Sequence, residues 1–311
     1  MTTALYTHRS SLDHVTPPCH PERVARYEAV TRALGQDRFA ALDRREAPVA
    51  DRADLLRCHP EEYIARIEAA IPREGARALD PDTHVSPGSL EPALRGAGGC
   101  CAAVDAVLSG EIGNAFVAMR PPGHHAETAR PMGFCLFGNV SIAAVRALEH
   151  HGLGRVAVLD FDVHHGNGTQ DLLWNEGRAL FCSSHQMPLF PGTGAAHETG
   201  AHGTIVNVPL TEGSGSREMR RAWEQDILPV VEEWEPEMIL VSAGFDAHAD
   251  DPLAGLDWTT EDFGWITRRI CEVAANTCGG RVVSTLEGGY DLQALAASVA
   301  AHVDVLMEFS Q

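Results

Sequence analysis

Acidic and imidazole side chains gather where an apolar run ends, in the segment VLDFDVHHGNGTQ at residues 158–170. Asp160, Asp162 and His164 alternate there, so on an extended strand they would face the same way. An unpaired buried charge is expensive, so a compensating group must accompany these side chains if the segment lies in the interior.

A metal ion is the compensating group that these residue types indicate. Asp162 and His164 offer an oxygen and a nitrogen to one cation, and Asp246, at the end of another apolar run, can supply a third ligand. Two carboxylates and one imidazole without a thiolate suit a catalytic Zn²⁺, or Fe²⁺ or Co²⁺, with coordination left open for water and substrate. An N-cap or a salt bridge would be the simpler explanation of any one acid alone.

The adjacent imidazoles of His124 and His125 follow the stiff turn sequence RPPG. Such a turn can hold two rings at a fixed angle, one as a general base towards the attacking water and one as a carrier of positive charge. Each ring needs a partner on its far nitrogen, and Asp160 and Asn167 are available. A surface pair of histidines would have the same sequence pattern, so the pair indicates catalysis only in combination with the acidic residues.

Aromatic residues in glycine- and proline-containing segments indicate where a substrate would be held. Tyr290 follows two glycines in EGGY, which let the backbone approach a ligand closely, and its phenol can donate to a carbonyl oxygen. Phe134 and Phe190 could wall a channel, although a single aromatic ring more often packs in a core.

Six short apolar runs predict the strands that position these residues. They occupy residues 114–119, 155–161, 179–184, 204–210, 238–245 and 281–287. Continuous apolarity indicates burial on both faces and hence a parallel sheet, and the stretches 139–150 and 216–234 suit crossover helices. Without a linker or repeat, we expect one α/β domain over residues 1–311, with a mostly parallel central sheet flanked by helices on both faces.

Polar clusters follow five of these runs: RPPGHH, DVHHGNG, SSHQMPLFPGTG, DAHADDP and GGY. In doubly wound sheets, ligands bind just beyond the carboxyl ends of the strands. We therefore expect the five clusters to converge on one rim.

The amino-acid composition favours certain classes of binding partner and one type of cellular compartment. A net charge of −19 and a pI near 5.2 argue against nucleic-acid binding through a basic face and leave cationic ligands open. Eight cysteines without a CxxC pair favour a reducing compartment. We see no signal peptide and no apolar run of membrane-spanning length, so we expect a cytoplasmic protein without membrane association.

Seven motifs together resemble the histone deacetylase superfamily, which has the arginase/deacetylase fold. In chain order they are HPER, RPPGHHA, GFCLFGNV, LDFDVHHGNGTQ, LFPGTG, SAGFDAH with DDPLAG, and EGGYDL, and they extend over residues 19–292. Asn167 and the DPLAG sequence are closer to class II deacetylases and their bacterial amidohydrolase relatives than to class I.

The resemblance implies a zinc-dependent amidohydrolase that removes acetyl or other acyl groups from an acylated amine, foremost an acyl-lysine peptide or protein. Asp162, His164 and Asp246 would hold one Zn²⁺ per chain. His124 would be the charged member of the histidine pair, and His125 the general base and then the general acid.

The same resemblance places Asp160 behind His124 and Asn167 behind His125, and has Tyr290 polarise the scissile carbonyl. Because asparagine is neutral, His125 should be less basic than it would be beside the aspartate of class I.

The resemblance also implies residues that contact the substrate. Gly133 would accept the substrate amide proton through its carbonyl, Phe134 and Phe190 would line the acyl-lysine tunnel, and Arg23 would lie at a floor channel through which acetate leaves. Leu253 stands where relatives specialised for polyamines carry an acidic gatekeeper, and leucine favours lysine-like or apolar acyl substrates.

A structural K⁺ site is implied as well, mostly through main-chain oxygens, from Asp160, Asp162, His164, Ser183 and Ser184. Rim loops of relatives are often shaped by a neighbouring subunit, and the stretch 72–92, rich in proline and glycine, is a candidate for such a loop in a homo-oligomer.

Three alternatives stay open. A two-metal ureohydrolase of the same fold would need an aspartate two places after Asp246, where this chain has His248. A deacetylase of acetylated polyamines or other small amines is compatible with the acidic net charge despite Leu253. A catalytically silent acyl-lysine binder would be expected to lack Tyr290 or a zinc ligand, and this chain has all of them.

Overall fold

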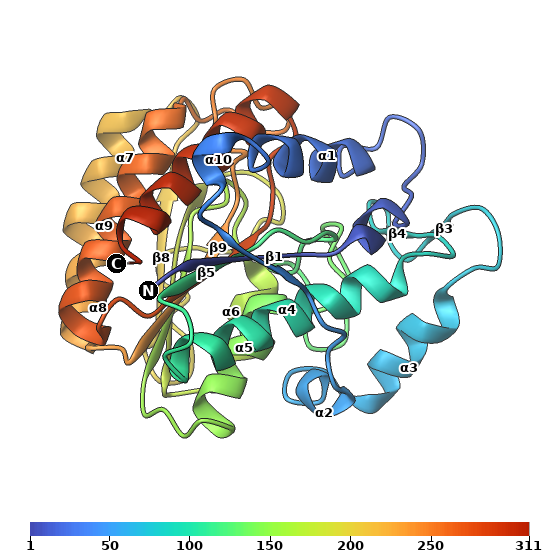
Figure 1. Cartoon of the computed structure of the whole chain (residues 1–311), viewed down its shortest axis with the longest axis horizontal. Coiled ribbons are helices and arrows are strands. Elements are labelled where there is room, and N and C mark those ends of the chain that lie inside the picture. The colour runs from blue at the N-terminus through green and yellow to red at the C-terminus, as the bar shows by residue number, and fades with distance from the viewer. Residues whose placement is uncertain (311) are drawn as a thin grey trace.

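A parallel sheet forms the centre of the molecule (Figure 1). Its strands lie in the order β2-β1-β5-β10-β9-β6-β7-β8. The computed structural model describes residues 1–310, and within them every neighbouring pair of this sheet is parallel. The strands are β1 (Thr3–Thr7), β2 (Asp43–Glu46), β5 (Asn114–Val117), β6 (Val156–Asp160), β7 (Ala179–Gln186), β8 (Ile205–Leu210), β9 (Met238–Ala243) and β10 (Val282–Leu286).

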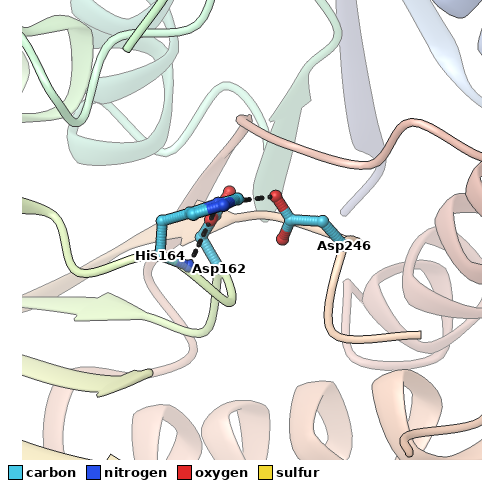
Figure 2. Close-up of side chains that lie close together, drawn as sticks. All are labelled: Asp162, His164 and Asp246. Carbon is cyan, nitrogen blue, oxygen red and sulfur yellow. Dashed lines mark hydrogen bonds and ion pairs between the residues drawn. The ribbon is translucent and has the colours of Figure 1, made fainter. Parts of the chain in front are cut away.

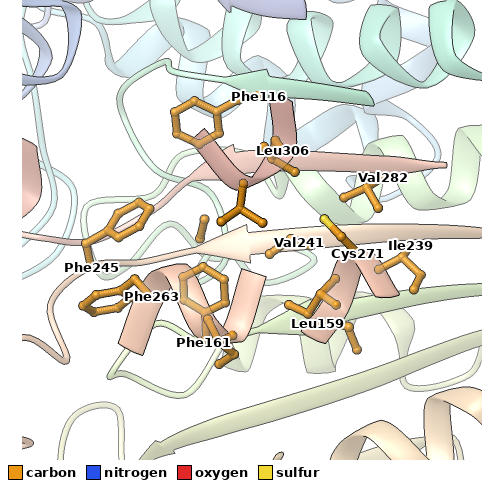
Figure 3. Close-up of a cluster of buried hydrophobic side chains, with 14 of the residues drawn as sticks. Phe116, Leu159, Phe161, Ile239, Val241, Phe245, Phe263, Cys271, Val282 and Leu306 are labelled. Atoms are coloured by element: carbon orange, nitrogen blue, oxygen red, sulfur yellow. The ribbon is translucent and has the colours of Figure 1, made fainter. Parts of the chain in front are cut away.

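The central strands are buried on both faces because their residues alternate between two apolar cores. Val156 and Val158 of β6 pack in the first core, whereas Leu159 packs in the second. Figure 3 shows the second core, where the ring centroids of Phe161 and Phe263 lie 6.1 Å apart. The continuous apolar runs of the sequence therefore reflect burial on two sides.

Helices cover both faces of the sheet. α4 (Leu90–Leu108) and α5 (Asn139–Glu149) contribute to the first core, and α9 (Thr260–Cys278) and α10 (Leu292–Glu308) to the second. The other α-helices of residues 1–310 are α1 (Val24–Ala33), α2 (Arg52–Leu55), α3 (Glu61–Ala70), α6 (Asn167–Leu173), α7 (Ser216–Ala222) and α8 (Leu228–Trp234). The predicted α/β class is confirmed.

The six predicted strands are all present, and each end lies within two residues of its predicted position. The sequence pattern does not predict β1 or β2. β2 has the charged sequence DRRE and lies at the edge of the sheet. Charges protect an exposed edge from pairing with another chain, but they also remove the apolar run that would reveal the strand.

The predicted helix at residues 216–234 contains a π-helical turn at Trp223–Ile227, between α7 and α8. Pro229 lacks an N–H group and cannot bond to the carbonyl of Gln225, four residues before it. A wider turn accommodates that missing bond, so the predicted helix is divided into α7 and α8.

The loop predicted at residues 72–92 contains a short antiparallel hairpin, in which β3 (Arg77–Ala78) pairs with β4 (His84–Val85). Its role in a homo-oligomer stays a prediction. Among the helices of residues 1–310, none combines the length and the apolarity that crossing a bilayer requires.

The second core contains a buried histidine that predicts acid sensitivity. The His302 nitrogens lie 2.7 Å from Thr267 Oγ1 and 2.9 Å from Ser284 Oγ, and burial lowers the pKa of His302 to about 3. Below pH 6.5 the unfolded chain therefore binds a proton that the folded chain does not. We expect this residue alone to remove about 2 kcal/mol of unfolding free energy between pH 7 and pH 5.

Urea unfolding of the wild type and of His302→Gln at both pH values measures this contribution. The variant should lose less stability on acidification than the wild type, whereas the exposed control His197→Gln should behave as the wild type does. An unchanged pH dependence in His302→Gln would show that this histidine is not held neutral.

Candidate active site

The carboxyl ends of β6 and β9 bring the three predicted metal ligands together. Asp162 and His164 follow β6, and Asp246 follows β9 (Figure 2). His164 Nδ1 lies 3.1 Å from Asp162 Oδ1 and 3.2 Å from Asp246 Oδ2. One ligand atom from each residue lies within 4.8 Å of the other two, as binding to a single ion requires.

A turn, rather than the predicted extended strand, aligns the first two ligands. β6 ends at Asp160, whose Oδ1 accepts from the N–H of Asp162 at 3.0 Å. Asp162 Oδ1 in turn accepts from the N–H of His164 at 2.9 Å. Aspartate commonly bonds the backbone two residues ahead in this way. The prediction of strand geometry was wrong, but the two turns bring the ligands together.

The donor set fits a divalent cation. Asp162 and Asp246 are fully buried. Besides the N–H of His164, Asp162 accepts the N–H of Gly288 at 2.8 Å, and Asp246 accepts the N–H of Val163 at 2.9 Å. Burial, and then the charge of Asp162, raise the pKa of Asp246. Two carboxylates this close and this buried require positive charge between them, and two oxygens with one nitrogen are ligands that Zn²⁺ accepts.

The histidine pair lies beside this cluster with the partners that the sequence predicts. The ring centroids of His124 and His125 are 4.0 Å apart. His124 Nδ1 lies 3.0 Å from Asp160 Oδ2, and His125 Nδ1 lies 2.7 Å from Asn167 Oδ1. Burial opposes charge on both rings, but the neighbouring aspartates raise the pKa of His124 well above its ordinary value. Burial and the charge of His124 lower the pKa of His125.

The hydrogen bonds of Asn167 determine which nitrogen of His125 is free. Asn167 Nδ2 donates to Glu127 Oε1 at 2.8 Å, so its Oδ1 faces His125 and must accept from Nδ1–H. The proton on Nδ1 leaves Nε2 with a lone pair. The neutral ring is thus prepared to take up a proton at Nε2.

A cavity of about 210 Å³ adjoins these residues. Its walls include His125, His164 and Tyr290, the predicted substrate contacts Gly133, Phe134, Phe190 and Leu253, and also Asp82 and Leu189. The ring centroid of Phe190 lies 5.2 Å from that of His125 and 6.2 Å from that of His164. The structure therefore brings the predicted base, one metal ligand and the predicted tunnel residues to one space.

Tyr290 is oriented by contacts on its backbone and its ring. Its N–H donates to Asp251 Oδ2 at 2.7 Å, and its ring lies 4.9 Å from the Arg26 guanidinium and 5.8 Å from the Phe134 ring. Burial raises the pKa of Tyr290 well above its ordinary value, so the phenol keeps its proton. Within residues 1–310 its hydroxyl has no hydrogen-bond partner and is available to a ligand in the cavity.

Comparison with known proteins agrees with this site. The family model for the histone deacetylase domain matches residues 20–306. The chain belongs to the histone deacetylase family. Together with the cluster of Asp162, His164 and Asp246, this membership makes it a metal-dependent deacetylase.

Relatives of this deacetylase occur in plants and bacteria. It is 40% identical over 316 residues to the chloroplastic histone deacetylase 10 of Oryza sativa subsp. japonica, covering 95% of this chain and 71% of the relative. It is 43% identical over 255 residues to a histone deacetylase-like amidohydrolase of Pseudomonas aeruginosa, covering 81% and 67%. The crystal structure of the HDA15 HD domain matches with a TM-score of 0.93 and 32% identity, covering 99% of this chain and 88% of that chain.

The prediction that Arg23 lies at an internal floor channel of the deacetylase was wrong. Arg23 is exposed and immediately precedes α1. Arg26, almost one helical turn further on, is fully buried and donates to Gly289 O at 2.6 Å and to Glu287 O at 2.5 Å. Arg23, the last residue of the HPER motif, is exposed at the start of α1. The arginine that contacts the Tyr290 loop is therefore Arg26.

Two residues that the sequence analysis did not assign hold the tunnel wall in place. Asp82 Oδ1 accepts from the N–H of Gly133, and Thr83 Oγ1 accepts from the N–H of Phe134, both at 3.1 Å. Phe134 has a φ of +69°, a left-handed conformation that costs energy for a bulky residue unless its surroundings hold it. The sequence DPDT, typical of an aspartate-stabilised turn, is the signal that could have indicated this clamp.

Two further acids organise the catalytic loops of the deacetylase. Asp251 accepts from the N–H groups of Tyr290 and Leu253, at 2.7 and 3.0 Å. Glu287 Oε2 accepts from the N–H groups of Gly123 and His124, at 2.6 and 3.1 Å. Neither acid lines the cavity. In the sequence, only their position in or beside the motifs could have indicated their role.

The residues of the predicted K⁺ site lie at neighbouring strand ends. Ser183 of β7 pairs with Asp160 of β6. The side chains of both serines are engaged elsewhere, since Ser183 Oγ lies 2.9 Å from His185 Nδ1 and Ser184 Oγ accepts from Trp223 Nε1 at 3.0 Å. Their main-chain oxygens would have to supply the ligands, and K⁺ binding stays a prediction.

Metal binding should stabilise the deacetylase, because an ion between Asp162 and Asp246 offsets the repulsion of two buried carboxylates. At a free Zn²⁺ concentration 100 times the dissociation constant, the gain is about 2.7 kcal/mol. We expect the melting temperature of chelator-treated protein to rise by several degrees on addition of Zn²⁺, with one equivalent bound per chain by elemental analysis.

Asp246→Ala should abolish both the shift in melting temperature and the bound equivalent. The exposed control Asp226→Ala should retain both. A shift of the same size in Asp246→Ala would place the stabilising ion at another site.

Proposed function

We propose that this deacetylase uses Zn²⁺ to hydrolyse the amide of an acylated amine, with acyl-lysine as its substrate class. The observation that supports the proposal is the single cavity in which His125, His164 and Tyr290 meet the walls formed by Phe134 and Phe190. A space of about 210 Å³ beside two aromatic rings suits a linear alkyl chain that ends in a small amide.

The reaction would place the substrate carbonyl beside Tyr290 and the metal ligands. When bound, the divalent ion supplies Lewis-acid activation of the carbonyl and of the attacking water. The Tyr290 hydroxyl donates to the carbonyl oxygen and stabilises the negative charge that develops there. The Gly133 carbonyl accepts the substrate amide N–H and fixes the orientation of the amide.

The histidine pair would move the proton. His125 accepts a proton from the attacking water at Nε2 and then delivers it to the departing amine nitrogen, so the ring begins and ends the cycle neutral. His124 stays cationic beside Asp160 and contributes positive charge close to the reacting carbonyl. The low pKa of His125 favours release of the proton to the amine in the second step.

An acetylated polyamine is the second candidate substrate. Asp82 lines the cavity, and the net charge of −19 attracts cationic ligands. Leu253 lies in the same wall, however, at the position where the polyamine-specialised relatives are expected to have an acid. The apolar side chain favours acyl-lysine.

A two-metal ureohydrolase and a silent binder receive less support. His248 Nδ1 lies 3.7 Å from Asp250 Oδ2, and His248 is not part of the metal-ligand cluster found in residues 1–310. Every residue that the proposed chemistry needs is present in or beside the cavity, which argues for catalysis rather than binding alone.

Tyr290→Phe, assayed on acyl-lysine peptides of several acyl lengths and on acetylpolyamines, tests the proposal. We expect the wild type to hydrolyse acyl-lysine peptides, to lose activity with a chelator and to regain it with Zn²⁺. Removing one donor to a developing oxyanion lowers kcat about 10²–10³-fold, so Tyr290→Phe should lose activity by this factor.

The metal content of Tyr290→Phe should equal that of the wild type, and the remote variant Tyr6→Phe serves as the matched control. A higher kcat/KM for acetylpolyamines would select the second candidate substrate. Wild-type rates in Tyr290→Phe, or no hydrolysis of any acyl amide by metal-loaded protein, would contradict the proposed function.

A further inference from the structure

The helix α3 and the strand β3 lie at one end of the molecule (Figure 1), and a groove there is lined by three arginines. It has a volume of about 410 Å³ and lies between the end of α3, β3 and the loop 129–131. Arg66, Arg77 and Arg130 line it, and Ile67 and Pro131 contribute apolar surface. No acidic side chain of residues 1–310 lines it.

Within residues 1–310, the three guanidinium groups have no carboxylate partner. None of them forms an ion pair within the part of the chain that the structure describes. Two acids of α3, Glu61 and Glu68, instead bind Arg52. Arg66 is held at the groove by its hydrogen bond to the Ala129 carbonyl.

This arrangement is unusual for the composition of the chain. Acids outnumber basic residues by 43 to 24, yet this cavity collects three cations and no anion. All 24 basic residues are arginines, whose planar guanidinium binds carboxylates and phosphates with two parallel hydrogen bonds. The electrostatic potential in the groove is therefore positive, and an anion from outside the chain can neutralise it.

The groove and the catalytic cavity are lined by residues that lie close together in the sequence. Pro131 lines the groove and Gly133 lines the cavity, while Leu79 lines the groove and Asp82 lines the cavity. Two residues of chain span at most about 7 Å and three residues about 11 Å. A peptide whose acyl-lysine occupies the cavity can therefore reach the groove with a neighbouring residue.

We propose that the groove binds an acidic side chain of the substrate, located about two to four residues from the acyl-lysine. This inference rests on the proposed function, because it assumes that a peptide lysine enters the cavity. The groove then makes the deacetylase selective for acyl-lysines in acidic segments, and the chemistry recognised is an anionic oxygen, of a carboxylate or of a phosphate group. A nucleic acid is less compatible, because the net charge of −19 repels a polyanion beyond the groove.

Peptides that differ only in the charge beside the acetyl-lysine test the proposal. One series carries two glutamates on the N-terminal or the C-terminal side, a second carries glutamines, and a third carries one phosphoserine. Exposed ion pairs are individually weak, so we expect a three- to tenfold higher kcat/KM for the acidic peptides, expressed in KM with unchanged kcat. The preference should decrease between 50 and 500 mM salt.

The double variant Arg77→Gln/Arg130→Gln should reduce this preference to near one. Its kcat/KM for a minimal acetyl-lysine substrate without flanking residues should equal that of the wild type. Arg221→Gln is the matched control, because Arg221 is exposed and belongs to α7, at the opposite end of the view in Figure 1.

The outcomes separate the groove from the catalytic proposal. Equal kcat/KM for acidic and neutral peptides, or a preference that survives in the double variant, would overturn the groove proposal while hydrolysis of the minimal substrate upholds the proposed function. If no acyl-lysine is hydrolysed, the proposed function fails, and fluorescence anisotropy of labelled acidic and neutral peptides decides about the groove. If the wild type binds the acidic peptide and the double variant does not, the groove is an anion site. Equal binding of the acidic and neutral peptides by the wild type would reject such a site. If an oligonucleotide binds more tightly than either acidic peptide, the groove is a nucleic-acid site rather than a site for the substrate, and the proposal is overturned.

Discussion

The structure depends on the burial of carboxylates at the ends of neighbouring central strands. Asp160, Asp162, Asp246 and Glu287 are all 0% exposed. Removing each charge from water costs several kcal/mol, and closely spaced like charges add repulsion, so the site is stable only with compensation. Backbone N–H groups and the His124 imidazolium supply part of it, and a divalent cation held by two of these acids would supply the rest. The need for that cation connects the stability of the site with its chemistry.

A second buried charge network joins the loop of the histidine pair to the loop of Tyr290. Glu22 accepts from Nε and Nη2 of Arg120, at 2.6 Å each, and from Nη1 of Arg26 at 3.3 Å. Arg120 begins the turn that carries the histidine pair, and Arg26 supports the loop that ends at Tyr290. One buried glutamate therefore fixes the relative positions of the proposed base and the proposed carbonyl donor. Such preorganisation matters because a hydrogen bond to a developing charge is effective only when its donor is already in place.

The sequence predicts those features that local patterns encode. Two-sided burial leaves continuous apolar runs, so six strands and the convergence of the polar clusters after five of them follow directly, and the metal ligands follow from residue type. Features that depend on contacts between distant segments do not: the Asp82 bond to Gly133, the Asp251 bond to Tyr290 and the charged edge strand β2 leave no periodic signal. The error at Arg23 has the same origin, because which arginine of a helix start faces inward depends on the loop that packs on it.

Anomalous diffraction at the zinc absorption edge, from crystals grown with Zn²⁺, tests the central claim most directly. The account predicts one strong peak per chain, about 2.0–2.2 Å from one oxygen each of Asp162 and Asp246 and from one nitrogen of His164. A zinc-loaded crystal without a peak between these three side chains, or with its peak on other residues, would contradict it.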